Sequence, residues 1–205
     1  MGTTRKPLRL SVNLKNRKSE VMIHSIGDSW CCREGDTGID RGWQEFALSP
    51  QCRHGVSGTT AEEWNADKNG MLSTALKSIQ DGDVVIVSLL GNDLRRGVAD
   101  GNLDSGEVFV AVQSLMGVVD KIKNVGAKVV LLIYSDPFRG KDSASKSGVA
   151  LMRTLLKGVA FVQLCESFDT TDILVEPGHF DGVDIHPTEM GHRAIAEYVS
   201  RTFGR

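Results

Sequence analysis

Residues 21–30 read VMIHSIGDSW, and this stretch decides how the rest of the chain is interpreted. Its aliphatic residues alternate with polar ones, which is typical of a short β-strand. The strand runs into Gly27, which has no Cβ to obstruct a sharp exit, and then into Asp28 and Ser29. In a parallel α/β sheet, a serine at the carboxyl end of a strand lies at the edge where ligands bind. A plain turn or a helix cap also fits these residue types, so the remaining sequence has to separate the two interpretations.

Length and composition are those of an ordinary globular protein. The chain has 205 residues, of which 40% are hydrophobic and 24% charged, and this fits one domain with a sizeable core. We assign residues 21–205 to that domain. The formal net charge of −2 argues against nucleic-acid binding as the main function, so we expect no nucleic-acid partner. The oligomeric state is left open.

The charge is uneven, because residues 1–20 carry six basic residues against the single acid Glu20. We interpret this basic N-terminal arm as a solvated edge segment, with contact to an anionic partner as the alternative. Weak alternation from Pro7 to Val12 suggests an extra edge strand. No apolar run follows the basic residues as in a signal peptide, and no stretch has transmembrane length. Four cysteines in a chain this long do not make a disulfide scaffold, so we predict a cytoplasmic protein with reduced thiols.

Strands alternate with helices along the whole chain. The run at 84–90, VVIVSLL, is β-branched and unalternating, as expected for a strand that is covered on both faces. The pattern predicts an α/β fold, with a central parallel sheet and helices on both sides in a three-layer α/β/α sandwich. We predict strands at about 21–26, 84–90, 128–134 and 159–164, and helices at about 43–48, 60–66, 70–79, 107–124, 143–157 and 188–202.

Four short polar segments follow predicted strands or lie in loops beside them. Residues 27–29 read GDS, 55–58 read GVSG, 91–93 read GND and 184–186 read DIH. Because the carboxyl ends of parallel strands share one edge of the sheet, these segments can meet there. Together they supply a nucleophile, a general base and oxyanion donors, which are the components of acyl transfer.

Each component has a candidate residue. Ser29 would attack a carbonyl carbon, and His186 would take the serine proton and return it to the leaving alcohol. A carboxylate would orient the imidazole. The backbone N–H groups of Ser29 and Gly58 and the side-chain amide of Asn92 are the candidate oxyanion donors, each contributing about 3–4 kcal/mol in the transition state.

The sequence resembles the SGNH or GDSL hydrolase family from about Val21 to Tyr198. The resemblance rests on four blocks in the right order, which are Gly27–Trp30, Gly55–Thr60, Val84–Asp93 and Gly182–Gly191. Trp30 stands where the family usually has leucine. The resemblance implies a flavodoxin-like three-layer fold and hydrolysis of esters or thioesters without a cofactor. It also implies that Ser29, Gly58, Asn92 and His186 carry the family's nucleophile, oxyanion and base positions.

The triad acid departs from the family pattern. The family places an aspartate three residues before the histidine, and here that position is Val183. Asp184 lies two residues before His186, and Asp181 lies five before it. We favour Asp184, because deleting one loop residue is a smaller change than displacing the acid by two. Asp181, or a Ser–His pair without a carboxylate, remains an alternative.

Two other classes of function compete with the serine hydrolase. His179, His186 and His192, with Asp181 or Asp184, could in principle bind zinc, but their spacing matches no compact ligand pattern. We therefore expect no metal. A non-catalytic module that holds a carbohydrate or an acyl group would fit the irregular acid spacing. The substrate is left open among acylated sugars, short-chain esters, thioesters and lysophospholipids.

Overall fold

A computed structural model describes five segments of the chain, which are residues 21–32, 42–94, 104–136, 143–181 and 186–204. The predicted N-terminal arm, including the weak strand from Pro7 to Val12, lies outside these segments. Asp184 of the predicted site also lies outside them.

The centre of the fold is a four-stranded parallel sheet in the order β1-β2-β3-β4. The β1–β2 pair is in register at Ile23 and Val84, and the β2–β3 pair at Val84 and Lys128. All five residues of β2 are buried, which fits a strand covered on both faces. The bounds of the strands are Ile23–Gly27 for β1, Val84–Ser88 for β2, Lys128–Ile133 for β3 and Glu166–Asp169 for β4.

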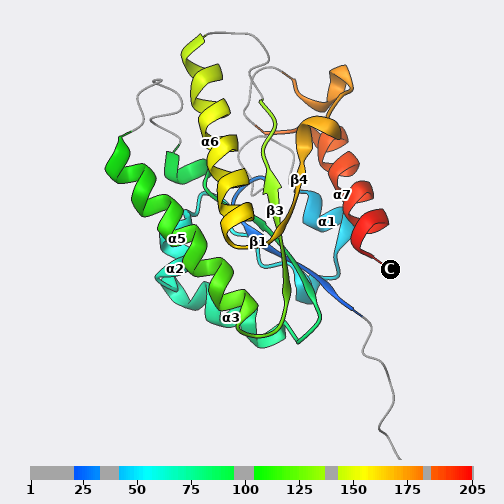
Figure 1. Cartoon of the computed structure of the whole chain (residues 1–205). Coiled ribbons are helices and arrows are strands. Elements are labelled where there is room, and N and C mark those ends of the chain that lie inside the picture. The colour runs from blue at the N-terminus through cyan, green and yellow to red at the C-terminus, as the bar shows by residue number, and fades with distance from the viewer. Residues whose placement is uncertain (1–20, 33–41, 95–103, 137–142, 182–185, 205) are drawn as a thin grey trace, which may run out of the picture.

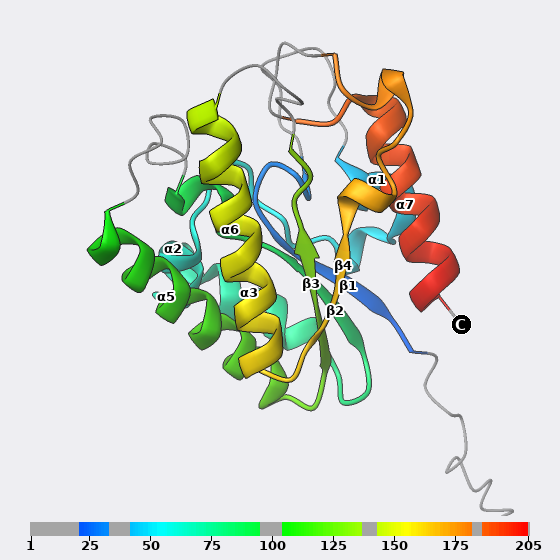
Figure 2. The same ribbon diagram turned by 45° about the horizontal axis from the view of Figure 1, so that its top comes forward.

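Helices cover both faces of the sheet. Helices α5 and α6 lie on one face and α1 and α7 on the other (Figure 1), and the turned view keeps them on opposite sides (Figure 2). The predicted three-layer α/β/α fold is therefore confirmed. Among the described residues, the labelled α-helices are α1 (Trp43–Ala47), α2 (Ala61–Asn65), α3 (Met71–Ser78), α5 (Ser105–Lys123), α6 (Ser143–Val162) and α7 (Glu189–Phe203), and residues 91–94 are also helical. The described segments also contain the 3₁₀ turns η1 (Pro50–Cys52), η2 (Lys68–Gly70), η3 (Thr170–Asp172) and η4 (Pro177–His179).

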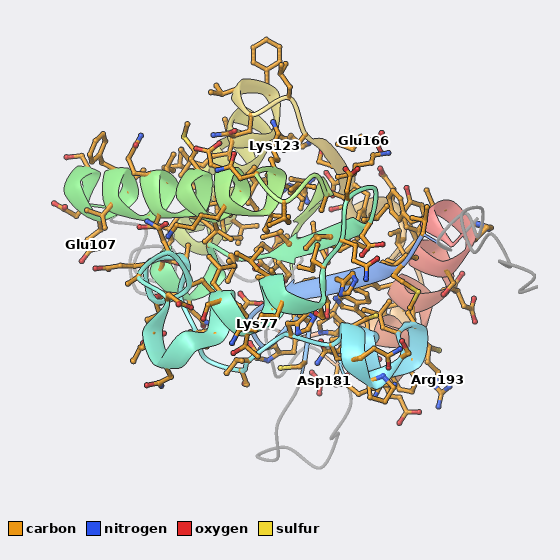
Figure 3. All side chains as sticks on the ribbon, turned by 90° about the horizontal axis from the view of Figure 1, so that it is seen from below. Lys77, Glu107, Lys123, Glu166, Asp181 and Arg193 are labelled. Atoms are coloured by element: carbon orange, nitrogen blue, oxygen red, sulfur yellow. The ribbon has the colours of Figure 1, made fainter. Side chains whose placement is uncertain are left out.

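Polar residues at the helix ends explain where several helices begin. Thr60 and Glu63 form a capping box at α2, and the Asp104 carboxylate accepts two backbone N–H groups at the start of α5. Each such cap stabilises a helix by about 1 kcal/mol. Figure 3 shows acidic Glu107 at one end of α5 and basic Lys123 at the other, an arrangement that complements the helix dipole. Within the described segments, no helix is both long and apolar enough to cross a membrane.

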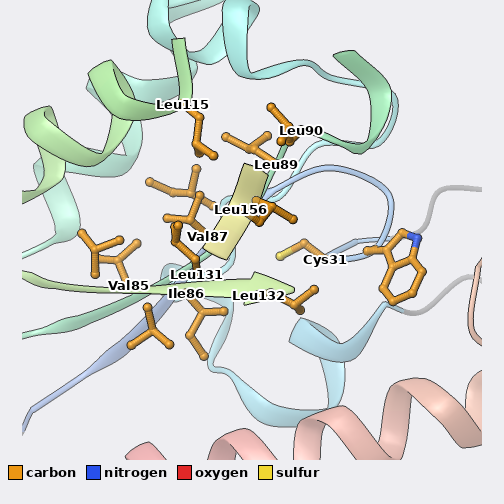
Figure 4. Close-up of a cluster of buried hydrophobic side chains, with 14 of the residues drawn as sticks. Cys31, Val85, Ile86, Val87, Leu89, Leu90, Leu115, Leu131, Leu132 and Leu156 are labelled. Atoms are coloured by element: carbon orange, nitrogen blue, oxygen red, sulfur yellow. The ribbon is translucent and has the colours of Figure 1, made fainter. Parts of the chain in front are cut away.

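The hydrophobic core fills the space between the sheet and the two helical layers. Aliphatic side chains of β2 and β3 form its centre, with Cys31 at the border of the cluster (Figure 4). Ile86 and Leu131 are fully buried, and burying a side chain of this size contributes about 1.5–3 kcal/mol. This rigid layer fixes the strand ends from which the polar site projects.

The segment after β1 shows where the strand order of the sheet reverses. Arg53 makes a parallel bridge to Ser25 on the side of β1 away from β2, and the N–H of Val56 donates to the carbonyl of Gly27 at 2.8 Å. The chain then crosses to β2 on the other side of β1. The carboxyl end of β1 is therefore the topological switch point, where open α/β sheets place their ligands.

The predicted strand at 159–164 is wrong. Residues up to Val162 continue α6, and the fourth strand is the short edge strand β4. The buried residues Met152, Leu156, Val159 and Ala160 recur at helical spacing, so the apolar run belongs to the core-facing side of a helix. Only Phe168 of β4 is buried, which leaves this strand without the apolar pattern that would have identified it.

Candidate active site

The nucleophile candidate lies in a tight turn at the end of β1. A Cβ on Gly27 would come within 2.7 Å of the Ser88 carbonyl oxygen, so glycine is required where β1 leaves the sheet. The N–H of Asp28 donates to that same carbonyl at 2.9 Å, and the N–H of Cys31 donates to the carbonyl of Asp28 at 2.9 Å. These bonds present the half-buried Ser29 at the switch point.

His186 lies directly against this serine. Its Nε2 is 2.6 Å from Ser29 Oγ, although the two residues are 157 positions apart. The start of α7 holds the histidine in place, because the Thr188 hydroxyl accepts the N–H of Gly191 at 3.3 Å. The N–H of Thr188 donates to the carbonyl of His179 at 2.9 Å. The structure thus brings the predicted nucleophile and the predicted base into hydrogen-bond contact.

The three candidate oxyanion donors come from different segments of the chain. Gly58 has φ +75°, a backbone conformation that favours glycine. The Asn92 amide donates to the Thr59 carbonyl at 2.9 Å, which leaves its second hydrogen for another acceptor. Within the described part of the chain, the N–H groups of Ser29 and Gly58 donate to no protein acceptor.

Asp93 links the helical turn at residues 91–94, after β2, to the segment that carries Gly58. Its carboxylate accepts the N–H of Ala61 at 2.9 Å and the N–H of Glu62 at 3.3 Å. Burial raises the pKa of this carboxyl group, and the two backbone hydrogen bonds oppose the shift. Asp93 therefore joins Asn92 to the start of α2 and has a structural role.

Of the two candidate acids, the structure describes only one. Asp181 is exposed, and it has interactions of its own. Asp184 lies outside the described residues. The choice of triad acid stays a prediction.

A second carboxylate, that of Asp28, is buried beside the nucleophile. It accepts hydrogen bonds from the Tyr134 hydroxyl at 2.7 Å and from the Ser88 hydroxyl at 3.2 Å. Burial raises the pKa of Asp28 to about 6, and these donors together with the N–H of Trp30 oppose the shift. The sequence did not single out Tyr134 or Ser88. The one signal they share is position, because Tyr134 ends the predicted strand at 128–134 and Ser88 lies two residues before the end of the predicted strand at 84–90.

The three histidines that we considered as zinc ligands have different surroundings in the structure. His179 is buried, and its Nδ1 accepts the N–H of Glu176 at 3.1 Å. His192 is fully buried within α7, whereas His186 faces Ser29. Within the described segments, no group of three or more His, Cys, Asp or Glu side chains is arranged to hold a metal ion.

Solved structures with the same fold include several α/β proteins at low sequence identity. The protein YXIM of Bacillus subtilis has a TM-score of 0.66 and 18% identity over 91% of this chain, which spans 57% of that protein. An acetyl xylan esterase variant from Geobacillus stearothermophilus has a TM-score of 0.62 and 16% identity, over 90% of this chain and 97% of that one. A putative lipolytic protein of the G-D-S-L family from Desulfitobacterium hafniense has the same TM-score and identity, over 87% of this chain and 97% of its own. The class of fold is that of the SGNH/GDSL hydrolases.

The sequence itself matches the GDSL-like Lipase/Acylhydrolase family over residues 25–194. This match spans most of the chain and includes Ser29, Gly58, Asn92 and His186. The chain therefore belongs to this family and is an ester hydrolase. No curated protein sequence matches it.

Proposed function

We propose that this protein hydrolyses carboxylic esters through a serine mechanism, with Ser29 as nucleophile and His186 as general base. The observation that carries the proposal is the 2.6 Å contact between Ser29 Oγ and His186 Nε2. This is the hydrogen-bond distance over which a histidine can accept a serine proton. The contact lies at the switch point of the sheet, where a substrate has access to it.

The reaction proceeds in two half-reactions. Ser29 Oγ attacks the ester carbonyl carbon while its proton passes to His186 Nε2, and a tetrahedral oxyanion forms. The intermediate collapses to an acyl-enzyme, and the imidazolium gives its proton to the departing alkoxide. Water then attacks the acyl group, with His186 again as base, and releases the carboxylic acid and the free serine. No cofactor takes part in these steps.

The oxyanion is stabilised by the N–H groups of Ser29 and Gly58 and by the free amide hydrogen of Asn92. The Gly27–Val56 and Asn92–Thr59 hydrogen bonds support this role, because they join the three donor segments before substrate arrives. Donors that are fixed in advance need no reorganisation when charge develops, and each contributes about 3–4 kcal/mol in the transition state.

Asp184 completes the triad in this proposal by accepting the second ring N–H of His186, with Asp181 as the alternative acid. A carboxylate in this position holds the imidazole in the required tautomer and stabilises the imidazolium. The support is the sequence position of Asp184, two residues before the histidine.

The proposed substrate is a small-molecule ester. Among the candidate substrates we favour an acylated sugar, because one solved structure with this fold is that of an acetyl xylan esterase. Short-chain esters, thioesters and lysophospholipids are the other classes. Hydrolysis of acetylated xylooligosaccharides, compared with butyryl and octanoyl esters of p-nitrophenol, separates a sugar ester from a longer acyl chain.

The test of the mechanism is hydrolysis of p-nitrophenyl acetate by the wild type and by Ser29→Ala. We expect Ser29→Ala to lose several orders of magnitude in kcat/KM while retaining the wild-type melting temperature. Equal rates would remove the serine mechanism, and loss of wild-type activity in EDTA would favour the metal hydrolase. A folded wild type that binds acetylated oligosaccharide without hydrolysing any ester would favour the binding module.

A further inference from the structure

We propose that Asp28 is a positioning residue that locks the nucleophile turn and the loop before Asn92 into one rigid unit, through Ser88 and Tyr134. The inference rests on the proposed function, because it assigns a role relative to Ser29 and Asn92. It concerns a carboxylate that takes no part in the proton transfers described above.

Asp28 first fixes the turn that carries its neighbour. Its Oδ1 accepts the N–H of Trp30 at 3.0 Å, so the side chain spans Ser29 and restrains the backbone on both sides of it. An aspartate that bonds its own backbone two residues on is a local turn former. The direction of the Ser29 hydroxyl therefore depends on where this carboxylate is held.

The strand β2 holds the carboxylate from a second side. The Ser88 hydroxyl donates to Oδ1 at 3.2 Å. A Cβ on Gly91 would lie 3.2 Å from Asp28 Oδ2, so the carboxylate lies directly behind the backbone that leads into Asn92. Any larger residue than glycine at position 91 would press on it.

Tyr134, the residue that directly follows β3, supplies the third restraint. The Tyr134 hydroxyl donates to Asp28 Oδ2 at 2.7 Å, and its ring packs edge-on against the Trp30 indole, with 4.9 Å between centroids. Tyr134 and Asp28 are both almost completely buried, at 2% exposed each. One carboxylate thus contacts residues at the carboxyl ends of β1, β2 and β3.

A buried carboxylate with only neutral donors is costly to maintain. A merely structural contact between strand ends could be made by neutral side chains at lower cost, and departures of this kind concentrate at functional sites. The benefit here is alignment, because a displacement of about 1 Å between reacting groups lowers a rate by about 10²-fold. Without the Asp28 side chain, the nucleophile turn keeps its backbone hydrogen bond to the Ser88 carbonyl but loses the contacts that tie it to Gly91 and Tyr134.

The test compares kcat and KM for p-nitrophenyl acetate per active site, with sites counted by fluorophosphonate labelling of Ser29. We expect Asp28→Ala to lower kcat about 100-fold with less than a threefold change in KM. Asp28→Asn should remain within about tenfold of wild type, because its amide oxygen still accepts the Trp30 N–H and its NH₂ can pair with the Tyr134 oxygen. Tyr134→Phe, which keeps the ring on Trp30, should fall between the two.

Asp83→Ala is the matched control, because Asp83 is also a buried carboxylate but lies at the opposite end of β2. It should lower the melting temperature and leave kcat per labelled site unchanged. Unchanged kcat in Asp28→Ala, equal losses in Asp28→Asn and Asp28→Ala, or an equal loss in Asp83→Ala would each overturn the positioning role. The serine mechanism itself is tested separately: activity that survives Ser29→Ala would contradict the proposed function, whatever the Asp28 variants do.

Discussion

Two serine–histidine contacts lie at opposite ends of the same sheet. At the carboxyl end, His186 Nε2 is 2.6 Å from Ser29 Oγ. At the amino end, His54 Nε2 is 3.0 Å from Ser78 Oγ. The second cluster continues through His24, whose Nδ1 faces His54 Nε2 at 3.3 Å and whose Nε2 faces the buried Asp83 carboxylate at 3.2 Å. By residue type alone, the amino-end cluster resembles a catalytic triad at least as closely.

The difference between the two ends shows that location, and not residue type, makes a hydrolase site. The Ser78 hydroxyl donates to the Ala75 carbonyl at 2.8 Å, within its own helix. Burial, with a smaller effect from His24, lowers the pKa of His54 to about 4, which makes it a weak base at neutral pH. Ser29 instead lies at a strand exit, between the segments that carry Gly58 and Asn92.

Replacing His186 and His54 by alanine, one at a time, gives the largest expected difference between the two ends of the sheet. We expect His186→Ala to lower kcat/KM by about 10⁴-fold, because the serine loses its general base. His54→Ala should change kcat/KM less than threefold, although it should lower the melting temperature. Initial rates with p-nitrophenyl acetate on both purified variants measure this, and comparable losses in the two would contradict a single active site.

The next largest effect concerns the triad acid of the carboxyl-end site. Asp184→Ala should lower kcat by about 10³–10⁴-fold if its carboxylate orients His186. Asp181→Ala, which removes an exposed side chain, should have an effect of less than tenfold. The reverse ranking would identify Asp181 as the acid, and small effects in both would indicate a serine–histidine pair.

The carboxyl-end site also includes the Asn92 amide, which is bonded to the Thr59 carbonyl. Asn92→Ala should lower kcat about 10²–10³-fold with little change in KM, because the amide acts on the oxyanion that exists only in the transition state. Steady-state kinetics separate the two constants. A rise in KM at constant kcat would show that Asn92 binds the ground-state ester instead.

The smallest expected effect concerns stability, and it arises at the amino end. Burial lowers the pKa values of His24 and His54 below 6.5, to about 4 for His54. Between pH 4 and 6.5 the unfolded chain therefore binds more protons, so the free energy of unfolding falls as the pH drops through this window. Asp28, with its pKa raised to about 6, acts in the opposite direction below pH 6 and offsets part of the loss.

Replacing His54 isolates this contribution. Between pH 7 and pH 5, the free energy of unfolding should fall by about 1 kcal/mol less in His54→Gln than in the wild type, after allowance for partial solvent screening. Urea unfolding of both proteins at the two pH values measures the difference. Identical losses in the wild type and the variant would show that His54 is not held neutral by the fold.

The sequence predicts the fold well where local pattern and burial agree. The apolar run at 84–90, interrupted by Ser88, identifies β2, and the glycine–aspartate–serine exit identifies the end of β1. The fourth strand predicted from the sequence is misplaced, because the apolar residues up to Val162 line one face of α6 and the strand β4 buries only Phe168. β4 lies at the end of the strand order and has one buried residue, so it lacks the continuous apolar run that marks a strand covered on both faces.

The site residues also fall into a group that the sequence predicts and a group that it does not. Ser29, Gly58, Asn92 and His186 could be singled out because each belongs to a short polar segment near a strand end. The contact between Asp28 and Tyr134 could not, since it joins residues 106 positions apart and neither spacing nor composition relates them. Only the register of β1, β2 and β3 brings these two side chains together.

Peptide mapping after fluorophosphonate treatment tests the central claim most directly. Such a reagent phosphonylates a serine whose hydroxyl is activated by a base and leaves other serines unmodified. We predict one adduct per chain, on Ser29, which disappears in His186→Ala and persists in His54→Ala. An adduct on Ser78, or an unmodified protein that still hydrolyses p-nitrophenyl acetate, would contradict the assignment of the active site to the carboxyl end of the sheet.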